Sequence, residues 1–129
     1  MIRKTEIRHE FVEFIPSERA EGVIYVSIKY ATSVHNCLCG CGSKVVTPIS
    51  PTGWKLIFDG ETISLYPSIG NWNLDCQSHY WVKNDRVEWA PKWTKEQIES
   101  GMNIEEQRKR TDYKGKKRRS LFRFFRRNL

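Results

Sequence analysis

The chain has 129 residues, of which 39% are hydrophobic, and this length fits a single domain with a modest core. Its charge is unevenly divided, because residues 1–107 carry 11 Lys or Arg and 14 Asp or Glu, whereas residues 108–129 carry 11 Lys or Arg and a single acidic residue, Asp112. No apolar run reaches the roughly 18 residues of a membrane span, and the N-terminus lacks the apolar segment of a targeting signal. Together with the cysteine usage described below, this predicts a cytoplasmic protein.

The first two thirds of the chain have the pattern of β-strands. Residues 23–30 alternate, with Ile24 and Val26 on one face and Val23 and Tyr25 on the other, which predicts a strand that turns one face to a core. A short strand is predicted at 44–49, before a turn rich in proline and glycine.

Two hairpins follow. Asp59-Gly60 lies between the alternating runs 54–58 and 62–66, and Asp-Gly is a strong hairpin signal because both turn positions adopt positive φ. A second hairpin is predicted around Asn84-Asp85, joining residues 79–83 and 86–89. Residues 67–71 are predicted to form a loop from their composition.

The end of the chain has a different pattern. Thr94 and Gln97 have the spacing of a capping box, which predicts the start of a helix. The sequence therefore predicts a mainly β fold, a small zinc-bound antiparallel sheet with hairpins, over residues 1–93. A C-terminal helix is predicted at 94–110 and a basic tail at 111–129.

The cysteines indicate a metal site. All four cysteines and two of the three histidines lie in His35–Gly42 and Cys76–His79, and thiolate and imidazole are the ligands that tetrahedral Zn²⁺ prefers. Gly40 and Gly42 would let the first segment bend, because glycine adopts positive φ at little cost. Buried free thiols and disulfides remain alternatives. The favoured ligands are Cys39, Cys41, Cys76 and His79, with Cys37 and His35 as substitutes.

Three blocks carry a resemblance to a known family. They are His35-Asn-Cys-Leu-Cys-Gly-Cys-Gly42, Pro67-Ser-Ile-Gly-Asn-Trp72 and Cys76-Gln-Ser-His-Tyr-Trp81. Over about residues 11–90 the chain resembles bacterial domains of unknown function that are encoded beside ubiquitin-like proteins and their activating and conjugating enzymes. The resemblance implies a peptidase that matures the ubiquitin-like protein or removes it from targets. Some members carry an ammonia-monooxygenase label. This sequence does not support that label, because it lacks a membrane span.

The residues allow more than one peptidase chemistry. A catalytic Zn²⁺ keeps a water ligand whose proton a nearby carboxylate accepts, and the candidate bases are Glu61 and Glu13. Asp59 is better explained by the hairpin turn. A zinc-dependent peptidase with the Trp72 and Trp81 region as substrate groove is the predicted function.

A serine mechanism is the second possibility. It would use Ser68 or Ser78 as nucleophile and His35 or His79 as base. Ser78 and His79 are neighbours, however, and neighbouring strand residues point to opposite faces, while Ser68 is interpreted as a turn hydroxyl. A Cys-His protease is also conceivable, but a metal would occupy the thiolates.

Two functions other than catalysis also fit the sequence. The first is a non-catalytic zinc-binding adaptor of the ubiquitin-like pathway. The second is a nucleic-acid-binding protein that uses the basic tail, since phosphates attract Lys and Arg. An acidic partner protein would suit the same tail.

Overall fold

The computed structural model describes residues 3–91, 94–104 and 106–110. The chain divides into two units, Met1–Lys92 and Trp93–Leu129, and each is described by itself. The basic tail at 111–129 lies outside the described residues. Within the described part of the chain, no helix has the length and apolar character needed to cross a membrane.

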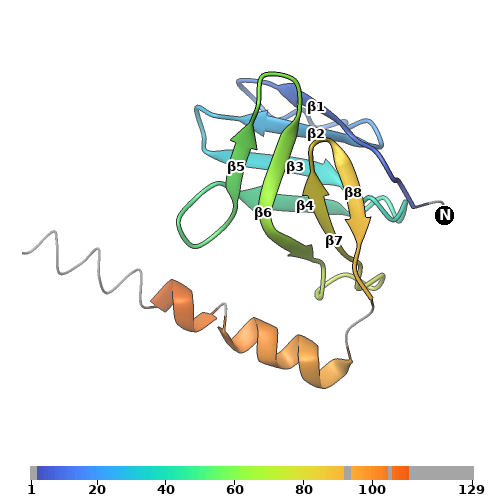
Figure 1. Ribbon diagram of the computed structural model, residues 1–129, viewed down its shortest axis with the longest axis vertical. Helices are drawn as coiled ribbons and strands as arrows, with labels where there is room; N and C mark the ends of the chain where they lie inside the picture. Colours follow the sequence, from blue (N-terminus) through green and yellow to red (C-terminus); the bar gives the residue numbers. More distant parts are fainter. Residues whose placement is uncertain (1–2, 92–93, 105, 111–129) are drawn as a thin grey trace, which may run out of the picture. The chain divides into compact units, whose positions relative to one another are not determined.

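The first unit consists of eight strands in two four-stranded sheets (Figure 1). The first sheet contains, in spatial order, β1 (Arg8–Phe11), β2 (Val23–Ser27), β3 (Thr32–Asn36) and β4 (Lys44–Pro48). The second contains β5 (Lys55–Phe58), β6 (Ile63–Gly70), β7 (His79–Lys83) and β8 (Arg86–Trp89). The mainly β prediction is confirmed, although β1 and β2 pair in parallel.

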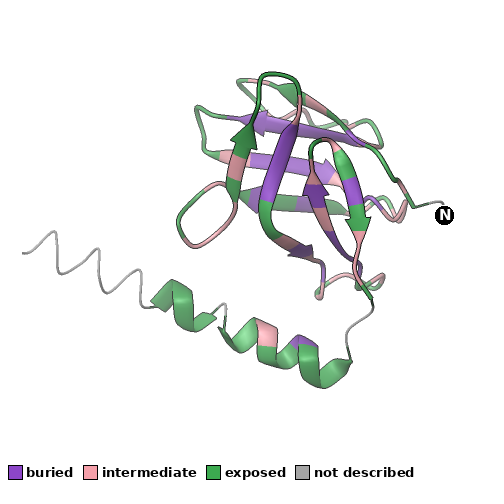
Figure 2. Cartoon of the chain, in the orientation of Figure 1, coloured by how far each residue is buried: buried purple, intermediate pink, exposed green. Residues whose placement is uncertain are grey.

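The core lies between the two sheets, whose strands cross at a steep angle in Figure 1. Buried residues are concentrated on β2, β3, β6 and β7 (Figure 2). Ile24 and Val26 of the first sheet and Leu65, Tyr80 and Val82 of the second are all fully buried. Because each sheet buries an apolar face against the other, the fold is a two-layer β structure.

Strand β2 differs from its predicted form. It ends at Ser27, and all five of its residues are buried rather than alternate ones. The segment before β2 covers its second face, because the Tyr25 hydroxyl accepts a hydrogen bond from the Ala20 amide and Ser27 donates to the carbonyl oxygen of Glu13. The predicted strand is therefore present but shorter, and both of its faces are buried.

Both predicted hairpins are present. In the β5–β6 hairpin, Phe58 pairs with Ile63, so the connection has four residues instead of a two-residue turn. The Asp59 carboxylate accepts hydrogen bonds from the amides of Glu61 and Thr62, which stabilises the longer loop. In the β7–β8 hairpin, Asn84 and Asp85 both have positive φ, 49° and 58°, as a two-residue turn requires.

The predicted loop at 67–71 is wrong. Strand β6 continues to Gly70, where Ile69 pairs with Tyr80 and Gly70 with His79. The register shifts between Leu65 and Ile69, so the intervening residues bulge out of the β6–β7 ladder. Burial of Ile69 holds the strand in the sheet beyond the bulge.

The second unit is helical at residues 95–104 and 106–110. The predicted capping box is present at its start, because the Gln97 amide donates to Thr94 Oγ1 at 3.2 Å and the Thr94 amide donates to Gln97 Oε1 at 2.8 Å. These two bonds satisfy backbone donors that have no partner within a helix.

Candidate active site and cysteine cluster

The four cysteines meet at one end of the two-sheet unit, and their sulfur atoms all lie within 4.8 Å of one another. We call Cys37, Cys39, Cys41 and Cys76 the cysteine cluster. The first three lie in the β3–β4 connection and the fourth in the β6–β7 connection. The cluster therefore links the first sheet to the second.

Glycine shapes the β3–β4 connection as predicted. Gly40 and Gly42 have φ values of +91° and +79°, which is the region that glycine enters at little steric cost. The chain consequently bends twice within a few residues. These bends turn the sulfurs of Cys39 and Cys41 toward the same centre as the sulfur of Cys37.

The cluster geometry fits a tetrahedral metal ion. The Cys37 sulfur lies 3.4 Å from that of Cys39 and 3.8 Å from that of Cys76, which in turn lies 3.8 Å from the Cys41 sulfur. Two thiolates on one Zn²⁺ are roughly 3.8 Å apart, since each Zn–S bond is about 2.3 Å. All four thiols are free of disulfide bonds. Four converging thiols can thus hold a metal ion.

The surroundings shift the pKa of the thiols in different directions. Burial raises the pKa of the Cys37 and Cys39 thiols. At Cys41 burial acts in the same direction, but hydrogen bonds from Ser43 outweigh it and lower the pKa to about 7. A bound cation deprotonates coordinating thiols outright. The cluster would therefore release protons when it takes up a metal ion.

Neither predicted histidine ligand belongs to the cluster. His35 lies on β3, fully buried, with its Nε2 atom 2.7 Å from the hydroxyl of Tyr80. Burial lowers its pKa to about 3, so the imidazole is neutral. His79 lies on the opposite face of β7 from Tyr80. Cys37, predicted as a substitute, belongs to the cluster in place of His79.

A buried polar network lies between the cluster and the core. The Asn71 amide nitrogen donates to Ser78 Oγ at 2.9 Å and to the Tyr80 hydroxyl at 3.4 Å. Ser78 Oγ is also 3.1 Å from the Cys37 sulfur. Such contacts orient the ligands of a metal site. Ser78, predicted as a possible nucleophile, is thus 7% exposed and packed against sulfur rather than against a histidine.

A serine and a histidine meet on the other face of the β6–β7 pair. His79 Nε2 lies 2.8 Å from Ser68 Oγ, which is within hydrogen-bonding distance. His79 is 6% exposed and Ser68 is half-buried. A nucleophile within hydrogen-bonding distance of a base is the arrangement that nucleophilic catalysis requires.

Strand register explains how these two side chains meet. Gly70 pairs with His79, and because alternate residues of a strand share a face, Ser68 lies on the same face as Gly70 and its partner. Diagonal neighbours of this kind are close enough for a long side chain to cross. Gly70 has no side chain, so the imidazole can extend across that position to the serine hydroxyl.

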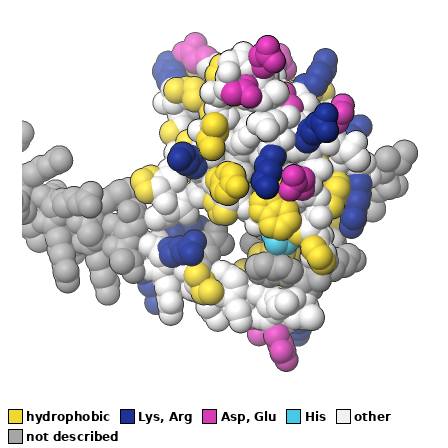
Figure 3. Space-filling model, viewed as in Figure 1, with side chains coloured by type: hydrophobic (Ala, Val, Ile, Leu, Met, Phe, Trp, Pro, Cys, Tyr) yellow, Lys and Arg dark blue, Asp and Glu magenta, His cyan; other side chains and the backbone are white. Residues whose placement is uncertain are grey.

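Two tryptophans border the histidine. The rings of Trp72 and His79 have centroids 5.0 Å apart in an edge-to-face arrangement, and those of His79 and Trp81 are 5.3 Å apart. Burial lowers the pKa of His79, which favours the neutral imidazole that can accept a proton. Figure 3 shows hydrophobic side chains above and beside a histidine on the viewed face.

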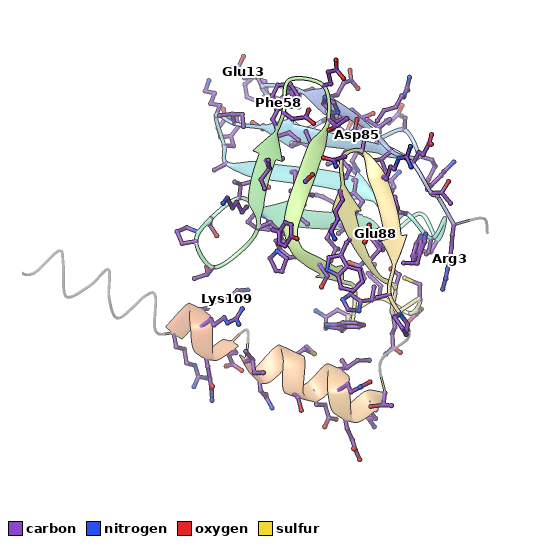
Figure 4. The ribbon with its side chains drawn as sticks, viewed as in Figure 1. Arg3, Glu13, Phe58, Asp85, Glu88 and Lys109 are labelled. Carbon is purple, nitrogen blue, oxygen red and sulfur yellow. The ribbon has the colours of Figure 1, made fainter. Side chains whose placement is uncertain are left out.

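The two predicted carboxylate bases lie elsewhere. Glu13 forms an ion pair with Lys29 at 2.6 Å, and Figure 4 shows it at the end of the unit away from the β6–β7 connection, near Phe58. Glu61 is exposed in the β5–β6 loop. Ser68 is the seventh residue after Glu61, and seven steps along an extended chain cover roughly 20 Å. The structure does not bring either carboxylate to the cluster or to Ser68.

The sequence predicted Ser68 and His79 among the possible members of a serine mechanism but did not favour this pair. The composition of residues 67–71 instead suggested a loop, which would have had no defined face. Only the pairing of Gly70 with His79 shows which histidine the serine contacts.

Comparison with known proteins finds one family that matches the chain. Residues 11–90, more than half of the chain, match the family BubE, whose description is bacterial ubiquitination-like system serine protease. The matched region contains the cysteine cluster, Ser68 and His79. No curated protein and no solved structure matches the chain. The resemblance seen in the three sequence blocks is therefore confirmed, and the chain belongs to the BubE family of bacterial ubiquitination-like systems.

Proposed function

We propose that this protein is a serine peptidase of a bacterial ubiquitination-like system, with Ser68 as nucleophile and His79 as general base. The 2.8 Å contact between Ser68 Oγ and His79 Nε2 is the observation that carries the proposal. The family description names a serine protease, which agrees with a hydroxyl rather than a metal-bound water as the attacking group. The predicted zinc-dependent mechanism is replaced by this one.

The two side chains suffice for acyl transfer. His79 Nε2 accepts the proton of Ser68 Oγ as that oxygen attacks the substrate carbonyl carbon. The same imidazole then donates the proton to the departing amine, and the C–N bond breaks to leave an ester on Ser68. Water, activated by His79, hydrolyses the ester and restores both groups.

The indoles of Trp72 and Trp81 would assist His79 in two ways. They confine the imidazole from two sides, which maintains its orientation toward Ser68. They also reduce contact of the ring with water, so that the neutral form persists. Both effects favour proton transfer between positioned groups.

The cysteine cluster would bind one Zn²⁺ in a structural role. Four thiolate ligands complete a tetrahedral site, whereas a catalytic zinc keeps one position for water. Zn²⁺ bound here would join the β3–β4 and β6–β7 connections. Since His79 follows Cys76 by three residues, the same link would hold His79 in register with Ser68.

The substrate we propose is the C-terminal region of a ubiquitin-like protein, as a precursor or as a conjugate. The activating and conjugating enzymes of the same system are the expected partners, and the cytoplasm the expected compartment. A closed cluster alone would also suit the non-catalytic adaptor. The Ser68–His79 pair favours the peptidase, because an adaptor has no need of a buried base beside a hydroxyl.

Cleavage and covalent labelling together test the proposal. The full chain is incubated with the precursor of the ubiquitin-like protein, and a fluorophosphonate is used to label activated serine. We expect a shortened precursor and a single label on Ser68, identified by mass spectrometry. Binding of the precursor with neither cleavage nor label would support the adaptor and exclude the peptidase.

The pH dependence of cleavage should reflect the environment of His79. Burial lowers its pKa from the usual 6.5, and the neutral form is the active base, so activity is lost only as pH falls through the lowered value. We expect kcat/KM to be nearly constant from about pH 8 to 6.5 and to decline below that range. A half-maximal rate at or above pH 6.5 would contradict this assignment.

The two carboxylates should be dispensable. Glu13→Gln and Glu61→Gln each remove a charge far from Ser68 while keeping the size of the side chain. We expect kcat/KM of both variants within about twofold of the wild type, whereas loss of a general base costs roughly 10²-fold to 10⁴-fold. A loss of that size in either variant would restore the metal-bound water mechanism.

A further inference from the structure

The backbone N–H and C=O groups of Gly70 point away from β7, the strand with which Gly70 pairs. The carbonyl oxygen of His79 faces the β8 side, because it accepts a hydrogen bond from the Ala90 amide at 2.9 Å. In an antiparallel sheet the N–H and C=O groups of one residue point to the same side, so those of His79 do not face β6. Its partner Gly70 therefore directs its own N–H and C=O to the side opposite β7.

A second contact supports this orientation. The Asn71 amide donates to the carbonyl oxygen of Ser78 at 2.8 Å. Residues next to each other on a strand alternate between the two sides of the ladder. If Asn71 faces β7, Gly70 faces away from it.

The position beside Gly70 is not taken by β5. Pairing between β5 and β6 ends at Lys55 with Tyr66. Before Lys55 the chain has joined the first sheet, because the Trp54 amide donates to the Pro48 carbonyl oxygen at 2.8 Å. Among the described residues, no strand pairs with β6 beyond Tyr66 on this side.

This unpaired segment contains the proposed nucleophile. Ser68 and Gly70 are both partly exposed. They lie two residues apart on the part of β6 beyond Tyr66, where β5 no longer pairs with it. We call residues 67–70 the open edge of β6. The indole of Trp72 covers one side of Gly70, since a Cβ atom there would lie 2.5 Å from Trp72 Cε2. The backbone N–H and C=O of Gly70 still point to the side of β6 opposite β7, where no strand among the described residues pairs with them.

The geometry points to the open edge of β6 as the substrate-binding element, where the tail of the ubiquitin-like protein adds as an extended strand. An added strand would lie beside β6 on the same side as β5, past the point where the pairing of β5 ends at Lys55. Gly70 would exchange backbone hydrogen bonds with this strand. Binding by strand addition uses main-chain hydrogen bonds. It would hold a scissile carbonyl beside Ser68. The inference rests on the proposed peptidase function and specifies its substrate as an extended peptide segment.

Strand addition restricts the substrate sequence. The residue that donates its amide to the Gly70 carbonyl cannot be proline, because proline has no N–H. Alternate amides of the bound tail would face β6, and the intervening ones would face away. Sensitivity of cleavage to changes in the tail backbone should therefore alternate along the tail.

Amide hydrogen exchange tests the binding mode without cleavage. The full-length Ser68→Ala variant is mixed with saturating precursor, and exchange is followed residue by residue. We expect exchange of the Gly70 amide to slow by about tenfold or more, the effect of a hydrogen bond worth about 1.4 kcal/mol. The amide of Gly60 in the β5–β6 loop is the matched control and should not change. Unchanged exchange at Gly70, or no binding, would overturn the inference.

Substrate peptides with single N-methylated amides provide the second arm, with the wild-type enzyme. Methylation at alternate positions of the tail should lower kcat/KM by roughly tenfold, while methylation between them has little effect. A uniform response, with cleavage of the unmodified peptide intact, would overturn strand addition and leave the peptidase standing. Failure of the wild type to cleave any precursor would instead overturn the proposed function.

Discussion

Substitution of Ser68 by alanine is expected to abolish processing of the ubiquitin-like precursor. The change removes the oxygen 2.8 Å from His79 Nε2, and loss of the nucleophile from such a pair lowers kcat by roughly 10⁴-fold or more. The fold should persist, because Ser68 is only partly buried and its strand is held by Ile69 and Leu65. Precursor cleavage is measured together with the thermal unfolding midpoint.

Ser64→Ala is the matched control on the same strand. Its hydroxyl accepts a hydrogen bond from the Asn84 amide at 2.9 Å, so its loss would cost some stability of the β6–β7 region. It lies four residues from Ser68 and has no contact with His79. We expect cleavage by this variant within a few-fold of the wild type. Equal activity of Ser68→Ala and the wild type would exclude the serine mechanism.

Removal of the proposed zinc ion, or of Cys76, is expected to unfold the two-sheet unit. Cys76 is the sole ligand that the β6–β7 connection contributes to the cluster. Structural Zn²⁺ contributes about 10–16 kcal/mol to folding in zinc-finger peptides, and domains are stable by only about 5–15 kcal/mol. Cys76→Ala should therefore lack bound zinc and show no cooperative thermal transition near that of the wild type.

The neighbouring exposed residue gives the control for this experiment. Asp75→Asn changes a side chain next to Cys76 without altering a thiol, and we expect one zinc per chain and an unchanged midpoint. Elemental analysis and calorimetry report both quantities. Chelator added to the wild type should reproduce the loss of the transition. A wild-type chain that contains no metal and unfolds at the same temperature with chelator would contradict the structural zinc site.

Local chemistry was sufficient for several elements of the fold. Asn84 and Asp85 adopt the positive φ values of a two-residue hairpin, and the bonds between Thr94 and Gln97 form the predicted capping box. These features depend on residues within four positions of one another. The sequence pattern therefore contains nearly all the information that determines them.

Features that depend on a buried face were harder to predict. The alternation in residues 23–30 predicted a strand with one face in a core, but the segment before β2 covers the second face as well. The composition of residues 67–71 suggested a loop, but burial of Ile69 extends β6. In each case a tertiary contact outweighs a local preference.

The sequence by itself determined that the sulfur ligands are concentrated in two distant segments, because all four cysteines lie in His35–Gly42 and Cys76–His79. The structure brings Cys37, Cys39, Cys41 and Cys76 together. Tertiary structure alone decided that His79 contacts Ser68 and not that cluster. The reason is strand register: Cys76 lies in the connection, while Ser78 and His79 lie on opposite faces. A shift of one residue would exchange those faces, and the sequence of the β6–β7 connection does not specify which register forms.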